Sequence, residues 1–195
     1  MKKILFTAHS KLHMEQLLEN LKKELDGNDS ELLLVMKPTL QTTMDLCEKL
    51  KKYTEATIGD KRGRIIFVFQ INSVNTSVLK IIDPNTPYAV ERLSALKYAF
   101  NNGFRTSVEA TPVIDNGLIE LVYKTQEFVT DYIFVDIVSE KYVNSIIDIL
   151  PKQLLRGAFD NYQRYNILKE IQNALSENEK VIWGDNFPKS FQNTL

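Results

Sequence analysis

Five short apolar segments alternate with helical patterns along this chain of 195 residues, and this alternation restricts the fold more than any other feature. The apolar segments lie at 2–9, 31–37, 63–71, 104–114 and 131–138. They are rich in β-branched and aromatic residues, as strands are. Regular alternation of strands and helices predicts crossover connections and a parallel sheet. The almost continuously apolar segment "GRIIFVFQI" agrees with this, because parallel strands are usually covered on both faces.

Helical patterns, in which apolar residues recur every three or four positions, follow these strands. They cover 14–26, 40–53, 76–82, 87–102 and 117–129. The C-terminal third reads as mostly helical, with a short strand-like segment, "VIW", at 181–183. We therefore expect a single domain over 1–195, with a partial barrel at 1–138 and a C-terminal helical extension at 139–195.

The helix expected at 87–102 has clear end signals. Thr86 can cap it, Pro87 suits its first position, and Gly103 is a typical residue just past a helix C-terminus. Its periodicity predicts one stripe, made of Val90, Leu93, Leu96, Lys97 and Phe100.

The composition argues against several classes of function. The 24 basic and 25 acidic residues give a net charge of −1, which offers no electrostatic case for nucleic-acid binding. No apolar run approaches the roughly 20 residues that a membrane-spanning helix needs, and "MKKILFTAHSK" reads as a first strand rather than a signal peptide. The one cysteine, Cys47, rules out an internal disulfide, so we expect a cytoplasmic protein.

Nucleotide-binding loops are not evident, because neither GxGxxG nor GxxxxGK[ST] follows any predicted strand. The two commonest nucleotide-binding forms of a doubly wound sheet lose support. The pattern by itself does not distinguish a doubly wound sheet from an open barrel.

Polar residues stand at the carboxyl end of every predicted strand, which is where parallel α/β folds bind ligands. They are Thr7, His9, Ser10, Lys37, Gln70, Asn72, Ser73, Glu109, Thr111 and Asp136. If the five strands curve round one axis, these groups converge on a single pocket.

Glu109 and Asp136 are the strongest candidates, because each is a carboxylate among apolar strand residues and needs a partner or a ligand there. Side chains two apart on a strand share a face. Ser107, Glu109 and Thr111 should therefore point into the barrel, and the residues between them should face the helices.

The other candidates have competing structural interpretations. His9 can bond to backbone at the strand end, Lys37 can be a solvated loop lysine, and Gln70 and Asn72 can satisfy loop backbone. The spacing of His9 and His13 occurs in metal sites, but a third ligand is not evident and we expect no metal.

Residues 79–115, "LKIIDPNTPYAVERLSALKYAFNNGFRTSVEATPVID", resemble the second half of the barrel in radical S-adenosylmethionine (radical SAM) proteins. The likeness is to the branch with spore photoproduct lyase-like and phage-type members, and it extends over about residues 3–138. That branch shows an acidic-Pro segment, "ERLxxLKxAxxxGF" and "TSVxxEPxxD". The resemblance implies a partial, open, TIM-like (βα) barrel of about five parallel strands and a site for S-adenosylmethionine. His9, Ser10, Lys37, Gln70, Asn72, Glu109, Thr111 and Asp136 would then be the cofactor-binding candidates.

Two departures from the family pattern matter. The CxxxCxxC loop that binds the family's [4Fe-4S] cluster is absent, and the first strand here corresponds to the family's second. The glutamate of the family's "EP" falls at Thr111. We therefore expect no [4Fe-4S] cluster from this chain alone, and no autonomous radical chemistry.

Three functions stay open: a truncated, split or degenerate radical SAM-related protein, a lyase or aldolase-like enzyme using Lys37 and Glu109, and a non-catalytic interaction module. Strand 2–9 would be an exposed edge, which invites self-association or a second polypeptide that carries the missing βα unit. The C-terminal helices or the strand at 181–183 could instead cover that edge.

Overall fold

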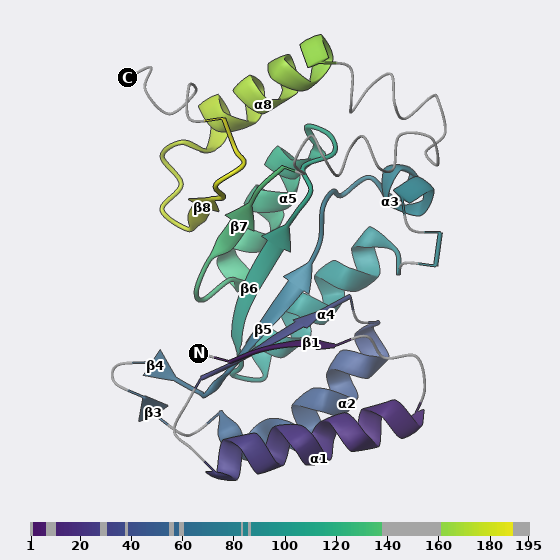
Figure 1. Cartoon of the computed structure of the whole chain (residues 1–195), viewed down its shortest axis with the longest axis vertical. Helices are drawn as coiled ribbons and strands as arrows, with labels where there is room; N and C mark the ends of the chain where they lie inside the picture. Colours follow the sequence, from purple (N-terminus) through teal and green to yellow (C-terminus); the bar gives the residue numbers. More distant parts are fainter. Residues whose placement is uncertain are drawn as a thin grey trace.

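A computed structural model describes the chain at residues 2–6, 11–27, 31–37, 39–54, 57–58, 61–82, 84–85, 87–137 and 161–188. Six parallel strands form one sheet in the order β1-β2-β5-β6-β7-β8. They are β1 (Lys2–Phe6), β2 (Leu32–Met36), β5 (Ile65–Gln70), β6 (Arg105–Ala110), β7 (Ile133–Val135) and β8 (Val181–Trp183). Their spatial order follows their chain order, so the sheet is wound in one direction and has the topology of an open barrel (Figure 1).

The five predicted strands are confirmed as β1, β2, β5, β6 and β7. The short segment "VIW" is a sixth strand, β8, which pairs with β7 at the opposite edge of the sheet from β1. The expectation that this segment covers the edge of the first strand is therefore wrong. The sequence analysis also missed a small antiparallel pair, β3 (Thr57–Ile58) and β4 (Lys61–Arg62).

Six helices and two 3-10 turns connect the strands in the described residues. They are α1 (Lys11–Gly27), α2 (Leu40–Leu50), η1 (Lys51–Tyr53), α3 (Thr76–Ile82), α4 (Ala89–Asn101), α5 (Gly117–Thr125), η2 (Gln126–Phe128) and α8 (Asn161–Leu175). The segment 139–160, where helix was also expected, lies outside the described residues, and the boundary at 138 stays a prediction. Within the part of the chain that the structure describes, none of the helices has both the length and the apolar composition needed to cross a membrane.

One face of the sheet, called here the outer face, packs against the helices. Alternate strand residues such as Leu34, Phe67, Val108 and Ile133 form one buried cluster with apolar residues of α1, α2, α4, α5 and α8. The ring of Phe67 stacks on that of Phe104 with centroids 4.8 Å apart. Because all five helices cover the same face, the opposite face is left to line the inside of the open barrel.

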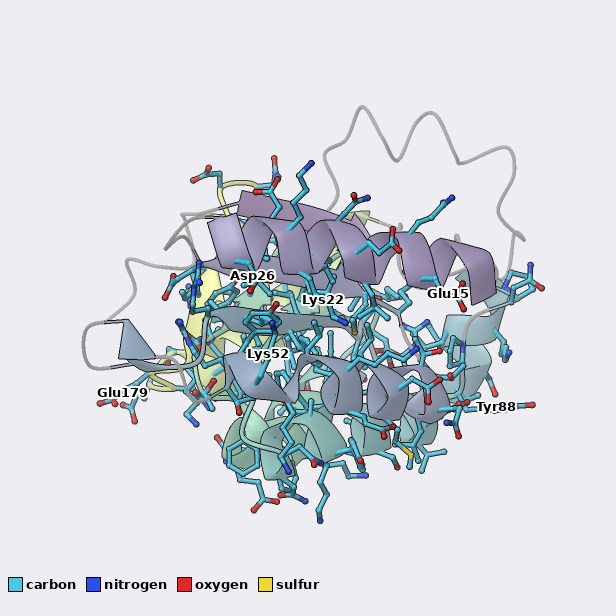
Figure 2. The ribbon with its side chains drawn as sticks, turned by 90° about the horizontal axis from the view of Figure 1, so that it is seen from below. Glu15, Lys22, Asp26, Lys52, Tyr88 and Glu179 are labelled. Carbon is cyan, nitrogen blue, oxygen red and sulfur yellow. The ribbon has the colours of Figure 1, made fainter. Side chains whose placement is uncertain are left out.

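The solvent side of the helix layer is polar. Asp26, near the end of α1, accepts hydrogen bonds from Lys52 Nζ at 3.4 Å and from the Tyr53 hydroxyl at 3.0 Å. Figure 2 shows Lys22, Asp26 and Lys52 on this side of the molecule. The contacts join α1 to η1 and leave the charged groups in water.

Helix α4 presents a different stripe to the sheet from the one expected. It begins at Ala89, two residues after Pro87, and Val90 is 69% exposed. Its buried residues are Ala89, Arg92, Ala95, Leu96 and Ala99. Small alanines let the helix approach the sheet closely, and Arg92 Nη1 donates to the backbone oxygen of Gln70 at 2.6 Å. Of the predicted stripe, Leu96 is fully buried and Leu93 is partly buried.

Gly103 ends α4 as expected. Its φ is +80°, a conformation that side chains with a Cβ adopt at a cost. The backbone N–H of Gly103 donates to Phe100 O at 3.0 Å, and that of Phe104 donates to Ala99 O at 3.2 Å. These are the two hydrogen bonds of a Schellman motif, which turns the chain directly into β6.

Gly103→Ala is expected to lower the free energy of unfolding by about 1–2 kcal/mol, because alanine resists the left-handed conformation. Steric overlap adds nothing, since no atom of the described residues lies within 4 Å of the position a Cβ would take. Urea denaturation measures the change. Gly103→Asn is the control and should cost less, because asparagine tolerates positive φ. Equal, near-zero effects for both would contradict the motif.

Candidate functional site

The second sheet face, called here the inner face, carries an apolar floor. Leu33, Val35, Ile66 and Val68 form a separate buried cluster against which Tyr132 packs. Strand pairing arranges this face in rows: Val35 lies beside Val68, and Val68 lies beside Ser107. The next row toward the carboxyl ends holds Gln70, Glu109 and Phe134. The inner face is therefore apolar in its middle and polar above it.

An ion cluster closes the amino end of the inner face. Arg105, at the start of β6, donates to carboxylate oxygens of Glu31 and Asp131. The side chains of Arg105 and Asp131 are 7% and 6% exposed, and that of Glu31 is 26% exposed. Although burial lowers the pKa of Arg105, its hydrogen bonds to the two carboxylates raise it above its ordinary value overall. This end of the inner face is held together by two ion pairs.

The polar row of β6 lies on the inner face, as predicted. Val108 and Ala110 are fully buried in the cluster under the helices, so Ser107 and Glu109 project to the opposite side. The Gln70 side-chain amide donates to Glu109 Oε2 at 3.3 Å. Glu109 is partly exposed, and its carboxylate can accept further hydrogen bonds.

Two hydroxyls at positions that alternate with Glu109 are buried without a well-formed hydrogen bond. Ser107 Oγ and Thr111 Oγ1 have no hydrogen bond with good geometry, although both atoms are shielded from solvent. Buried polar atoms of this kind are uncommon in native proteins and require an explanation. Both belong to the row of alternate residues that contains Glu109.

The loop beyond β5 and β6 is also polar, and several of its groups pair with one another, although Asp115 Oδ1 is buried without a well-formed hydrogen bond. Asn72 Nδ2 donates to Pro112 O at 3.1 Å, and Ser73 Oγ donates to Asp115 Oδ2 at 3.0 Å. Burial raises the pKa of Asp115, against lowering effects of Ser73 and the backbone of Gly117. Asp115 and Ser73 therefore tie the loop after β5 to the start of α5.

Asp136 has a structural partner that the sequence analysis did not anticipate. It is 6% exposed, and its Oδ2 accepts a hydrogen bond from Asn186 Nδ2 at 3.0 Å. A Cβ at Gly184 would lie 2.2 Å from Asp136 Cγ, so the chain after β8 passes directly over this carboxylate. Asp136 is thus held by the C-terminal segment, and among the described residues it makes no hydrogen bond to Glu109.

The remaining predicted residues are Lys37, His9, Ser10 and Thr7. Lys37 is exposed, and continuing the strand register by one residue puts it beside Gln70. His9 and Ser10, with Thr7, lie outside the described residues. No three His, Cys, Asp or Glu side chains are grouped as metal ligands would be within the part of the chain that is described.

Tyr132 is a site residue that the sequence analysis missed. It precedes β7, and the two-residue alternation that relates it to Phe134 puts it on the inner face beside Ser107. Burial raises the pKa of its phenol, and the carboxylates of Glu109 and Asp131 raise it further, against a small lowering effect of Ser107. The same alternation, counted back from Asp136 along "DYIFVDIV", could have identified it.

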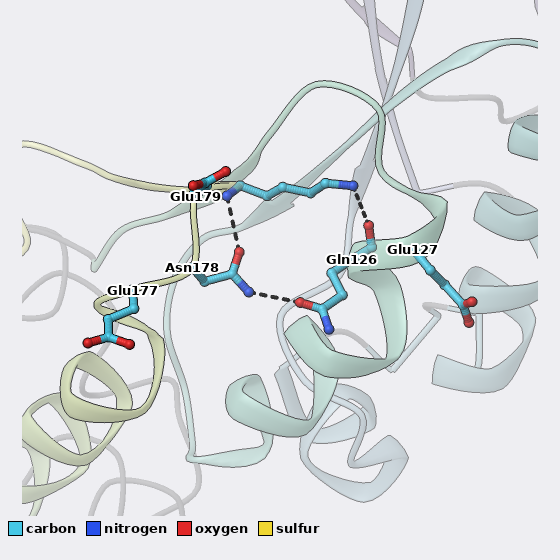
Figure 3. Close-up of a pocket in the computed structure, with 6 residues that line it drawn as sticks. Gln126, Glu127, Glu177, Asn178 and Glu179 are labelled. Carbon is cyan, nitrogen blue, oxygen red and sulfur yellow. Dashed lines mark hydrogen bonds between the residues drawn. The ribbon is translucent and has the colours of Figure 1, made fainter.

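A shallow hollow of about 400 Å³ lies elsewhere, before the amino ends of β7 and β8 (Figure 3). It is lined by Gln126, Glu127, Glu177, Asn178, Glu179 and Lys180. Lys180 Nζ already donates to Gln126 O and Val129 O, both at 2.6 Å. Its position at the opposite end of the sheet separates it from the polar row of β6.

The molecule belongs, by fold and site, to the class of open, singly wound βα barrels with a polar inner face at the carboxyl ends of the strands. No family model matches the sequence, and no curated protein matches it. Two crystal structures of SuiB from Streptococcus suis are similar in fold. One shares 12% identity over 88% of this chain and 42% of that chain, with a TM-score of 0.43. The other, bound to S-adenosylmethionine, shares 10% identity over 94% of this chain and 49% of that chain, with a TM-score of 0.47. This chain spans less than half the length of either.

Proposed function

We propose that this chain is a radical SAM-related domain that binds S-adenosylmethionine on its inner face without autonomous radical chemistry. The observation that carries the proposal is the series Ser107, Glu109 and Thr111 beside the apolar floor, with two buried hydroxyls that lack well-formed hydrogen bonds. The resemblance of residues 79–115 to radical SAM barrels is the reason for proposing S-adenosylmethionine as the ligand.

The residues on this face suit S-adenosylmethionine chemically. The ligand carries a positive sulfonium, an ammonium group and ribose hydroxyls, all of which are attracted to or donate to a carboxylate. Glu109 supplies that carboxylate, Gln70 and Asn72 supply amide groups, and Thr111 supplies a hydroxyl. Hydrogen bonds to the ligand would satisfy the buried hydroxyls.

Cys47 does not fit an iron–sulfur cluster. A [4Fe-4S] cluster is held by several cysteine thiolates, and this sequence contains one cysteine. Cys47 is 3% exposed in α2, on the outer face of the sheet, and burial raises the pKa of its thiol to about 12. In the family, the cluster supplies the electron that cleaves S-adenosylmethionine, so binding without cleavage is what we propose for this chain alone.

Glu109→Gln is expected to weaken S-adenosylmethionine binding about tenfold, because a charge-assisted interaction with a cationic ligand is lost. Isothermal titration calorimetry measures the affinity, and urea denaturation should show nearly unchanged stability because the side-chain shape is kept. Glu120→Gln, on the exposed side of α5, is the matched control and should bind like wild type. Saturable binding that Glu109→Gln leaves unchanged would remove Glu109 from the site.

A partner at the sheet edge is the second part of the proposal. Strand β1 pairs with β2 on one side, and no described strand pairs with its other side. Free strand edges recruit further strands. We propose pairing with a second polypeptide that carries a cluster-binding βα unit, or with a second copy of this chain. Light scattering on the purified chain separates the two, since only self-pairing raises the mass in isolation.

Two other functions stay in competition. A lyase or aldolase-like enzyme would use Lys37 and Glu109, and an interaction module would use neither. Absence of S-adenosylmethionine binding combined with turnover of carbonyl substrates would favour the enzyme. Absence of both would favour the module. The cytoplasmic location stays a prediction.

A further inference from the structure

We propose that Tyr132 is a ligand-binding residue which, with Glu109, discriminates against anionic groups in favour of uncharged ligand groups that both donate and accept hydrogen bonds. Amides and hydroxyls are the groups of this kind. The inference rests on the proposed location of the ligand site on the inner face, but it does not require that the ligand is S-adenosylmethionine.

The position of Tyr132 is set by its neighbours. Its ring packs against the floor of Leu33, Val35, Ile66 and Val68. Its backbone oxygen accepts a hydrogen bond from Val108 N at 3.0 Å, which anchors it to β6. An aromatic side chain has only two rotatable bonds, so a ring held in this way presents its hydroxyl in a restricted direction.

The hydroxyl of Tyr132 is a donor in this position. Burial and the carboxylates of Glu109 and Asp131 raise the pKa of the phenol, so it keeps its proton at neutral pH. The hydroxyl of Ser107 lies nearby, but no hydrogen bond with good geometry joins the two. Tyr132 is partly exposed, so a ligand can approach its side chain.

Glu109 provides the complementary acceptor one row above. Its carboxylate accepts a hydrogen bond from the Gln70 side-chain amide at 3.3 Å, which leaves further acceptor positions. A carboxylate next to a protonated phenol disfavours anionic ligand groups. Of the cations near this face, Arg105 is paired with two carboxylates at the far end, and Lys37, which the strand register puts beside Gln70, is exposed to water, where its charge is screened. A carboxylate or phosphate group is therefore disfavoured here, whereas an amide or a hydroxyl can donate to Glu109 and accept from Tyr132.

The test uses three probes of similar shape: benzamide, benzyl alcohol and benzoate. The full chain is labelled with ¹³C in its tyrosine rings, and Tyr132→Phe assigns the Tyr132 signal. Benzamide or benzyl alcohol should shift this signal saturably. The probe that binds more tightly shows whether the site prefers an amide or a hydroxyl. Benzoate should bind at least about tenfold more weakly, and Tyr132→Phe should weaken binding of the uncharged probe about tenfold, measured by isothermal titration calorimetry.

Two variants sharpen the result. Tyr88→Phe is the matched control, because Tyr88 is 56% exposed beside Lys80, away from the inner face, and should change nothing (Figure 2). Glu109→Gln should reduce the preference for the uncharged probe over benzoate. Equal binding of benzoate, unchanged affinity in Tyr132→Phe, or no saturable shift with either uncharged probe would overturn the inference. Isothermal titration calorimetry with S-adenosylmethionine tests the proposed function separately. The role of Tyr132 and the binding of S-adenosylmethionine can therefore each be contradicted without the other.

Discussion

Arg105→Ala is expected to lower the free energy of unfolding by about 3–5 kcal/mol, the cost of leaving a buried charge without its partner. Arg105 is the cation between Glu31 and Asp131, and its removal leaves two carboxylates at the closed end of the inner face. Urea denaturation at neutral pH measures the loss.

Two comparisons test the reason for this loss. Lys124→Ala breaks the exposed pair with Glu120, whose side chains are 54% and 56% exposed, and should cost no more than about 0.5 kcal/mol. The triple variant R105M/E31Q/D131N should recover much of the stability, because no uncompensated charge remains. A triple variant as unstable as Arg105→Ala would show that the guanidinium acts through packing and not through charge.

Leu96→Ala is expected to cost about 2–5 kcal/mol, the range for deleting a buried leucine side chain. Leu96 is 1% exposed, at the contact between α4 and the sheet. Val90→Ala on the same helix is the control and should change stability by less than about 0.5 kcal/mol, since Val90 is 69% exposed. Thermal and urea unfolding of the pair measure both. Comparable losses for the two would mean that α4 is rotated relative to the sheet.

Helices, strands and the face of β6 could be predicted from the sequence because they depend on local periodicity. Alternation along 107–111 was enough to put Glu109 on the inner face and Val108 under the helices. Gly103 was recognised as the end of α4 because a left-handed residue after a helix is a local requirement of the backbone. The same local reasoning places the ligand candidates Gln70 and Asn72 at one end of β5.

Contacts between distant segments were decided only by the tertiary structure. The pairing of β8 with β7 and the cover that Asn186 gives Asp136 join residues about 50 positions apart, which no local pattern encodes. The buried face of α4 was misjudged because its alanines and Arg92 pack against a sheet assembled elsewhere in the chain. Strand order likewise settled the winding, since adjacent pairing puts every packed helix on one face. Local backbone geometry specifies the elements, whereas packing between them specifies which polar groups meet.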